Sequence, residues 1–165
     1  METMAVLPDD QVLEIGCGRG SAVSLVADRL TTGRIVAIDR AATMVRIATA
    51  SNMSHISSGR AEIQRAGFES ADLPASRFTK IFAVNLGLFW LGDASQQIDR
   101  VRRLLAPGGQ LYVFGERPTA AHAVANLAST ELLLKANNFS TTRSCFRRGR
   151  GVLTCVTGTP TSGPG

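Results

Sequence analysis

The chain has 165 residues, of which 44% are hydrophobic and 19% are charged, and its formal net charge is +5. These values predict one globular domain with an ordinary core, and no apolar run approaches the roughly 20 residues of a membrane helix, so we expect no membrane partner. The three cysteines and two histidines lack metal-ligand spacing, so no metal site is expected. The lack of an export signal predicts a cytoplasmic protein.

The first part of the chain alternates between β-prone and helical patterns. Strands are predicted at residues 11–15, 34–38 and 61–65, and helices at 21–30 and from 41 to the Ser57-Ser58-Gly59 stop. Val23, Val26 and Leu30 recur at helical spacing in the first helix. The first two strands are almost wholly apolar, which is expected of strands buried on both faces of a sheet.

The second part of the chain repeats this alternation and ends on two strands with no helix between them. Strands are predicted at 80–84, 110–114, 139–146 and 151–157, and helices at 94–105 and 119–135. Strands alternating with helices indicate an α/β domain with a largely parallel sheet, and the last two strands should form an antiparallel hairpin. We place the domain at residues 1–158 and expect a disordered tail at 159–165, which is rich in Gly, Pro, Ser and Thr.

A glycine loop follows the first strand directly and opens the first helix. Gly16, Gly18 and Gly20 allow a tight turn and a close approach to a ligand, and the helix start offers free N–H groups. The dinucleotide fingerprint needs Gly or Ala at the sixth position, where this chain has Ser21, and the Walker phosphate loop is absent. The spacing therefore weakens an NAD interpretation.

Asp39 ends the second strand. A carboxylate at that place can accept hydrogen bonds from both hydroxyls of a ribose, and it would repel the 2′-phosphate of NADP. The alternative is that Asp39 only caps the helix that begins near Ala41. The glycine loop at a suitable distance favours the ribose.

Four segments in order resemble the motifs of the class I S-adenosylmethionine-dependent methyltransferases. Residues 12–20 resemble the first motif, 35–39 the second, 78–85 the fourth, and 104–111 the turn that enters the fifth strand. The resemblance covers roughly residues 8–157. It implies a Rossmann-like, seven-stranded, mostly parallel sheet with order 3-2-1-4-5-7-6, an antiparallel last strand and helices on both faces.

The resemblance also implies S-adenosylmethionine as the cofactor, with S-adenosylhomocysteine as the product. Glu14 and the glycine loop would face the methionine portion, Asp39 would hold the ribose, and the Asn85 carbonyl would lie near the amino group and sulfonium. Arg40 and Met44 would flank the adenine, with Gly67 and Phe68 on its far side. The implied cofactor-binding residues are Glu14, Gly16, Cys17, Gly18, Gly20, Asp39, Arg40, Met44, Gly67, Phe68 and Asn85.

Two features depart from the family pattern. Members often carry an acidic residue where this chain has Gly67, and Glu69 is a substitute shifted by two positions. Only about ten residues precede the first motif, where many members have helices that roof the substrate pocket. We therefore expect a pocket that is open, lacks part of its lid, or is completed by another subunit, as in a homodimer.

Methyl transfer mainly requires alignment of the acceptor with the methyl group, and a general base only where the acceptor must lose a proton. Candidate bases are His122 and Glu116, for which a surface or capping role is the alternative. Leu88, Phe89 and Trp90 are candidates for an apolar substrate pocket, or for packing against the following helix.

The sequence also predicts the surroundings of Cys17 and His55. Cys17 is a small residue that fits inside the loop, and a nucleophilic role for it is not expected. His55, late in the second helix, is expected to be exposed.

The basic cluster of the last hairpin admits an RNA partner, but the end of the fourth predicted strand lacks the Asn/Asp-Pro-Pro-aromatic motif of enzymes that methylate nucleic-acid amino groups. The cluster comprises Arg143, Arg147, Arg148 and Arg150. We therefore predict an enzyme that methylates a small molecule. The alternatives are an RNA-directed methyltransferase and a non-catalytic cofactor-binding scaffold that needs a partner.

Overall fold

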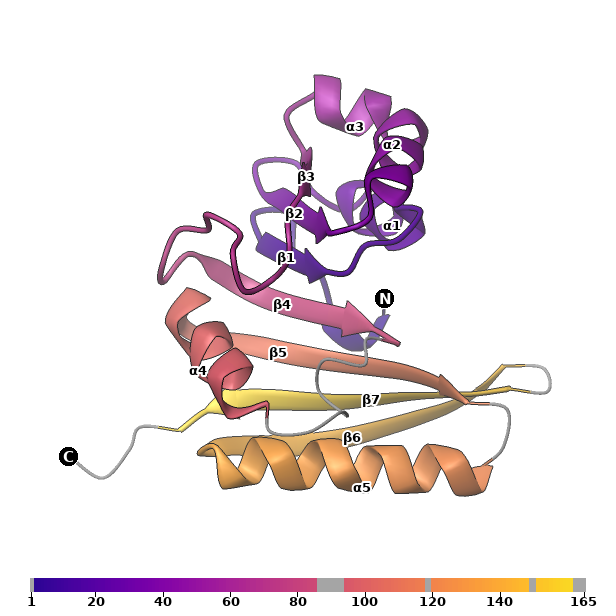
Figure 1. The fold of residues 1–165 in the computed structure, drawn as a ribbon, viewed down its shortest axis with the longest axis vertical. Coiled ribbons are helices and arrows are strands. Elements are labelled where there is room, and N and C mark those ends of the chain that lie inside the picture. The colour runs from indigo at the N-terminus through magenta and orange to yellow at the C-terminus, as the bar shows by residue number, and fades with distance from the viewer. Residues whose placement is uncertain (1, 86–93, 118–119, 149–150, 162–165) are drawn as a thin grey trace.

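The computed structural model describes residues 2–85, 94–117, 120–148 and 151–161 (Figure 1). In chain order its elements are a short 3-10 helix η1 (Glu2–Met4), β1 (Gln11–Ile15), α1 (Ser21–Ala27), β2 (Arg34–Asp39), α2 (Ala42–Ser51), α3 (Met53–Ser57), β3 (Ala61–Arg65), β4 (Phe78–Val84), α4 (Ser95–Leu104), β5 (Leu105–Arg117), α5 (Ala120–Ala136), β6 (Phe139–Arg148) and β7 (Gly151–Pro160). No helix among these residues is long and apolar enough to cross a membrane.

The strands form one sheet with the order β3-β2-β1-β4-β5-β7-β6. Strands β1 to β5 run parallel to one another, and β7 runs antiparallel to both β5 and β6. The predicted fold class is confirmed, including the strand order and the antiparallel last strand. The order reverses between β1 and β4, and the crevice beyond the strand ends at such a reversal is where open α/β sheets bind ligands.

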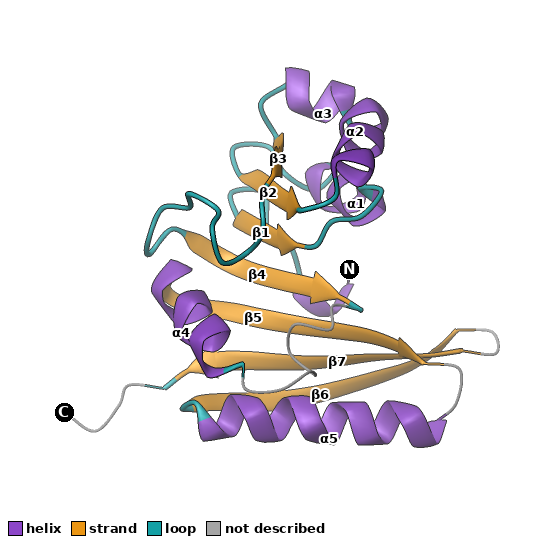
Figure 2. Ribbon diagram, viewed as in Figure 1, coloured by secondary structure: helices purple, strands orange, loops and turns teal. Residues whose placement is uncertain are grey.

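The two faces of the sheet bury different residues of the same strands. Leu13 and Ile81 belong to a core on the side of α4 and α5, whereas Val12 and Phe82 belong to a core on the side of α1 and α2. Helices thus cover both faces (Figure 2). Because side chains alternate along a strand, Glu14 shares the face of Val12 and lies under α1 and α2.

The predicted second helix is divided at Asn52 into α2 and α3. The buried Asn52 side chain donates hydrogen bonds to the carbonyls of Gly20 (3.1 Å) and Ala48 (2.9 Å), so it joins the helix to the glycine loop. The prediction that His55 is exposed is wrong, because α3 turns its ring inward to an exposure of 8%. Its Nε2 lies 3.5 Å from both Ser24 Oγ and Asp28 Oδ1.

Five strands are longer than predicted, and β5 and β7 show the largest extensions. β5 begins at Leu105, which pairs with Phe78 before a register shift restores regular pairing at Lys80 and Gln110. The Pro-Gly-Gly turn therefore lies within the strand as an irregularity. β7 continues to Pro160, so the strand includes two residues of the predicted tail, and residues 162–165 lie outside the described part of the chain.

A buried ion pair joins the start of β1 to β4 at the end of the sheet opposite the ligand crevice. Lys80 Nζ lies 2.7 Å from Asp10 Oδ2, and the two side chains are only 11% and 5% exposed. Thr79 donates to the other oxygen of Asp10 at 2.6 Å, and the Leu7 amide donates to Oδ2 at 2.7 Å. Both oxygens of this buried carboxylate thus have partners, as burial demands.

Candidate functional site

The glycine loop extends the pairing between β1 and β2. The amides of Gly16 and Cys17 donate to the carbonyl of Ile38 at 2.9 and 3.0 Å. Gly16, Gly18 and Gly20 have φ values of 74°, 52° and 82°, a region in which glycine alone is unstrained. A Cβ at Gly20 would lie 2.7 Å from Asn52 Nδ2 and 2.9 Å from the Cβ of Ala48 in α2, so this glycine is needed for packing against α2.

Gly18 differs from Gly20 because it faces open space. A Cβ at Gly18 would meet no atom of the described residues within 4 Å. Packing against these residues therefore gives no reason for this glycine, and a ligand can approach its backbone closely.

Asp39 connects the ends of β1 and β2. Its Oδ2 accepts a hydrogen bond of 2.9 Å from the Gly18 amide, and its Oδ1 accepts one of 2.8 Å from the Ala41 amide. The N-cap of α2 is Ala41, with no side-chain capping bond, so the contact of Asp39 with the Ala41 amide lies in the turn before the helix and is not the cap that the alternative predicted. Each carboxylate oxygen has a second lone pair, so these bonds leave acceptors for ribose hydroxyls.

Glu14 lies beneath the loop with an exposure of 2%, and its buried Oε2 has no hydrogen-bond partner among the residues that the structure describes. Burial, together with the negative charge of Asp39, raises the pKa of this carboxyl to about 8. A buried acid with an unused oxygen beside an open turn is suited to a cationic or hydrogen-bond-donating group.

Cys17 is buried in the loop, and burial, followed by the charges of Glu14 and Asp39, raises the pKa of its thiol to about 12. A thiol with this pKa remains protonated and is a poor nucleophile at neutral pH. Of the other cysteines, Cys155 is buried and Cys145 is exposed.

The segment after β3 begins beside Asp39, because the Ala66 amide donates to the Asp39 carbonyl at 3.0 Å. A Cβ at Gly67 would lie 3.2 Å from Glu69 Oε2, so the Glu69 carboxylate lies next to the position where the family's acid would project. Phe68 is 5% exposed and belongs to the core, with the Arg100 guanidinium 5.4 Å from its ring centre.

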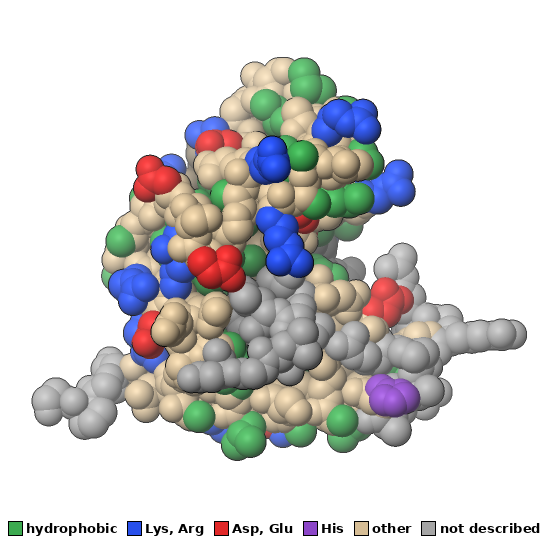
Figure 3. All heavy atoms as spheres, viewed as in Figure 1, with side chains coloured by type: hydrophobic (Ala, Val, Ile, Leu, Met, Phe, Trp, Pro, Cys, Tyr) green, Lys and Arg blue, Asp and Glu red, His purple; other side chains and the backbone are tan. Residues whose placement is uncertain are grey.

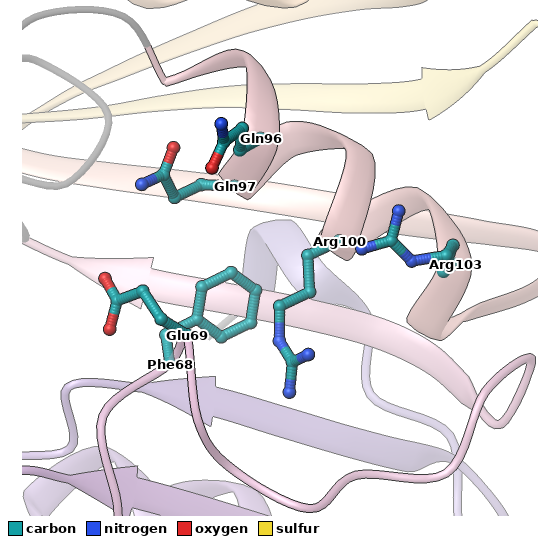
Figure 4. A pocket seen from close by; sticks show the side chains of 6 residues that line it. All are labelled: Phe68, Glu69, Gln96, Gln97, Arg100 and Arg103. Carbon is teal, nitrogen blue, oxygen red and sulfur yellow. The ribbon is translucent and has the colours of Figure 1, made fainter.

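A pocket with a volume of about 160 Å³ lies between this segment and α4 (Figure 4). Arg100 lies across the pocket from Glu69 and donates a hydrogen bond to the Ala71 carbonyl. Gln97 Oε1 and Arg100 Nε are buried and have no partner in the described part of the chain. The lining residues are Phe68, Glu69, Gln96, Gln97, Arg100 and Arg103. No sequence pattern predicted this pocket, because it depends on how a loop meets a distant helix.

Asn85 follows β4 with a φ of 52°, in the left-handed region that few residues other than glycine adopt. Its amide donates to the Phe114 carbonyl at 2.9 Å, and its side-chain Oδ1 accepts a bond of 2.7 Å from the Glu116 amide. Both bonds tie the end of β4 to β5. The family resemblance implied a role for the Asn85 carbonyl only, so the role of the side chain was missed.

Of the other predicted site residues that the structure describes, three are exposed and one is half-buried. Arg40 is exposed and Met44 is half-buried, both after the end of β2. Glu116 near the end of β5 and His122 in α5 are both exposed. The predicted substrate-pocket residues Leu88, Phe89 and Trp90 lie outside the described residues. Within the described ranges, no three His, Cys, Asp or Glu side chains could together hold a metal ion.

The basic hairpin is partly neutralised by α5. Glu131 forms an ion pair with Arg143, a second with Lys135 at 2.9 Å, and a hydrogen bond with Thr141 at 3.0 Å. On the face seen in Figure 3, acidic side chains of the described residues lie among the basic ones. The side chains of residues 147–150 lie outside those described.

The chain is similar in sequence to several trans-aconitate 2-methyltransferases. The trans-aconitate 2-methyltransferase of Variovorax paradoxus is 30% identical over 107 residues, which cover 62% of this chain and 37% of that protein. The match to this relative therefore spans little more than a third of its length.

Two solved structures share the fold at low sequence identity. A SAM-dependent methyltransferase from Aquifex aeolicus matches with a TM-score of 0.78 and 15% identity over 95% of this chain and 86% of that one. The cyclase SpnF matches with a TM-score of 0.76 and 16% identity over 96% and 78%. At such identities, the likeness concerns the fold alone.

The family comparison covers the segment that contains the glycine loop, Asp39, Asn85 and the Pro-Gly-Gly turn. Residues 12–109 match the family described as a methyltransferase domain. This is more than half of the chain, and it includes four of the five parallel strands. The chain therefore belongs to the methyltransferase-domain family.

Proposed function

We propose that this chain binds S-adenosylmethionine and transfers its methyl group to a small molecule. One observation carries the proposal: the buried Glu14 carboxyl, whose Oε2 has no partner among the described residues, lies close to Asp39 beside an open glycine turn. The Asp39 carboxylate at this turn disfavours a pyrophosphate, which a glycine loop would otherwise suit. The raised pKa of Glu14 keeps it protonated at neutral pH in the empty protein, and it can lose this proton to pair with a cationic group. The turn therefore favours a nucleoside whose other end carries positive charge, as this cofactor does through its ammonium and sulfonium groups.

Each end of the cofactor has residues suited to it. The Asp39 carboxylate would accept hydrogen bonds from the ribose, and the Gly18 backbone would lie against the cofactor without a side chain in the way. Free N–H groups at the start of α1 would attract its carboxylate. Arg40 and Met44 would flank the base, and Glu69 would accept a hydrogen bond from its amino group in place of an acid at position 67.

The bound cofactor would supply an electrophilic methyl group on a good leaving group. The remaining task of the protein is to align the acceptor, which can lower a barrier by as much as roughly 7–11 kcal/mol. Glu116 and His122 are the proposed bases for an acceptor that must lose a proton, and Leu88, Phe89 and Trp90 are proposed to line the acceptor pocket.

The relatives named trans-aconitate 2-methyltransferase support a small organic acid as the acceptor. Because the match covers 37% of the first relative, we propose the acceptor class rather than the individual compound. We also propose a cytoplasmic location, where the free cysteines would remain reduced.

The proposal is tested in two steps on the purified chain. Isothermal titration calorimetry should detect binding of S-adenosylmethionine and S-adenosylhomocysteine, and an Asp72→Ala variant of an exposed acid should bind equally well. Production of S-adenosylhomocysteine is then measured with trans-aconitate and a panel of other small acids. No binding would refute the cofactor, and binding without turnover of any acceptor would favour the non-catalytic scaffold.

A further inference from the structure

The hydrogen bonds of Asn85 differ from those of a regular parallel ladder. In such a ladder, a residue that faces the next strand makes two hydrogen bonds to it. Its N–H donates to one carbonyl of that strand, and its C=O accepts from the N–H of the residue two positions further along. The Asn85 amide donates to Phe114, so the regular partner of its C=O is the Glu116 amide. That amide instead donates to the Asn85 side chain at 2.7 Å.

The left-handed conformation explains this exchange. A φ of 52° turns the peptide after Asn85 away from the ladder, and the side-chain carbonyl takes the place of the backbone carbonyl. Among the described residues, no backbone N–H donates to the Asn85 C=O. Asparagine is suited to this position because it tolerates the left-handed region and carries a carbonyl on a short side chain.

We infer that Asn85 is a positioning residue, whose side chain replaces its own backbone carbonyl in the sheet and thereby frees that carbonyl for the cofactor. The inference rests on the proposed function for the identity of the ligand. The carbonyl lies at the carboxyl end of β4, beside the reversal of strand order between β1 and β4. A neutral acceptor directed there suits the cofactor's ammonium group, and a hydrogen bond to a charged group is stronger than one between neutral groups.

Three substitutions separate the two properties of asparagine. Asn85→Asp keeps both the carbonyl-like acceptor and the tolerance of positive φ. Asn85→Gly keeps the tolerance but leaves the Glu116 amide without its side-chain acceptor. Asn85→Ala loses both, so its backbone should return to the ladder and its carbonyl should bind the Glu116 amide.

The matched control is Asn138→Ala. Asn138 also has a positive φ, of 56°, but lies in the turn between α5 and β6. This variant carries a similar backbone strain and should lower the melting temperature without affecting the ligand.

The first measurement is S-adenosylhomocysteine affinity by calorimetry. We expect Asn85→Ala to bind at least about tenfold more weakly, as loss of one hydrogen bond to a charged group predicts, and Asn85→Gly, whose backbone can keep the left-handed conformation and leave the carbonyl free, to lose less affinity. Asn85→Asp should stay within about threefold of the wild type, and Asn138→Ala should be unchanged. Equal affinity of Asn85→Ala and the wild type, or equal losses in Asn85→Asp and Asn85→Ala, would overturn the inference.

The second measurement needs no cofactor. Hydrogen exchange of the Glu116 amide, followed by NMR, should be slow in the wild type and Asn85→Asp and faster in Asn85→Gly. An unchanged rate in Asn85→Gly would contradict the side-chain replacement even if Asn85→Ala does not fold. A wild type that binds no cofactor but shows these exchange rates would refute the proposed function, and with it the cofactor as the ligand of the Asn85 carbonyl. It would still confirm that the Asn85 side chain replaces the backbone carbonyl in the sheet.

Discussion

The Gly18 amide donates a hydrogen bond of 2.9 Å to Oδ2 of Asp39. The acid at the end of β2 therefore holds the turn at the end of β1, in addition to any contact with a ligand. Loop shape and ribose recognition consequently depend on the same side chain, and a change at Asp39 should affect both.

Replacing Asp39 should weaken cofactor binding more than loss of the ribose contact alone. Asp39→Ala removes two backbone hydrogen bonds as well as the ribose acceptors, and hydrogen bonds to charged groups contribute about 1.5–3 kcal/mol each. We expect the dissociation constant to rise at least roughly hundredfold. Asp39→Asn keeps one oxygen and should be intermediate. Calorimetry checks this against Asp72→Ala, and undiminished affinity in Asp39→Ala would exclude the assigned site.

Gly18→Ala should separate ligand binding from folding. Both Gly18 and Gly59 have a positive φ and open space where a side chain would project, so alanine at either position should cost about 1–2 kcal/mol of backbone strain. Only the Gly18 methyl group would lie against the cofactor. We expect urea denaturation to show similar losses for Gly18→Ala and Gly59→Ala, and calorimetry to show weaker binding for Gly18→Ala alone. Equal affinities would mean that the ligand does not approach Gly18.

The Glu14 carboxyl should make the empty protein less stable at high pH. Burial and the charge of Asp39 raise its pKa from 4.5 in the unfolded chain to about 8 in the folded one. The stabilisation is full below pH 4.5 and is lost as the pH rises through 8, because the folded state then loses the proton that it binds more tightly than the unfolded chain does. Glu14→Gln keeps the neutral shape without this loss.

Urea denaturation of both proteins at pH 5 and pH 9 measures this difference. The free energy of unfolding of the wild type should fall relative to Glu14→Gln by an amount on the order of 2–5 kcal/mol. Parallel pH profiles for the two proteins would show that Glu14 titrates normally.

The buried pair at the opposite end of the sheet should have the reverse pH dependence. Burial alone would raise the pKa of Asp10, but hydrogen bonds from Lys80, Thr79 and the Leu7 amide outweigh it, and the pKa is lowered. Its contribution is therefore present above the unfolded value of 3.8 and is lost as the pH falls through the lower, folded value.

Asp10→Asn should destabilise the fold by about 3–5 kcal/mol, because it leaves the Lys80 ammonium buried without its counter-ion. The double variant Asp10→Asn/Lys80→Met should recover part of this loss. Urea denaturation at pH 7 measures both. If the double variant is as unstable as the single one, the unpaired charge is not the cause.

Periodicity and turn residues predicted the fold well because the strands are short, apolar and separated by glycines. The division of the second helix at Asn52 was not predictable, since it depends on a bond from that side chain to the distant Gly20 carbonyl. The burial of His55 depends on the same break. Local patterns carry no information about contacts between residues thirty positions apart.

Part of the candidate site could likewise be predicted from the sequence, and part could not. Gly18 and Asp39 follow directly from sequence spacing, because both stand at strand ends whose positions a parallel sheet fixes. The Asn85 side-chain bond depends on the register between β4 and β5, and the closeness of Glu69 to Gly67 depends on the shape of an irregular segment. The sequence specifies neither of these directly.

The burial of two cysteines gives the protein a chemical handle. Burial raises the pKa of Cys17 to about 12 and of Cys155 to about 11, while Cys145 is exposed on β6. A maleimide dye at neutral pH should therefore label Cys145 selectively. Because β6 is the edge strand on the far side of the sheet order from β1 and β2, a fluorophore there could report on partner association without disturbing the glycine loop.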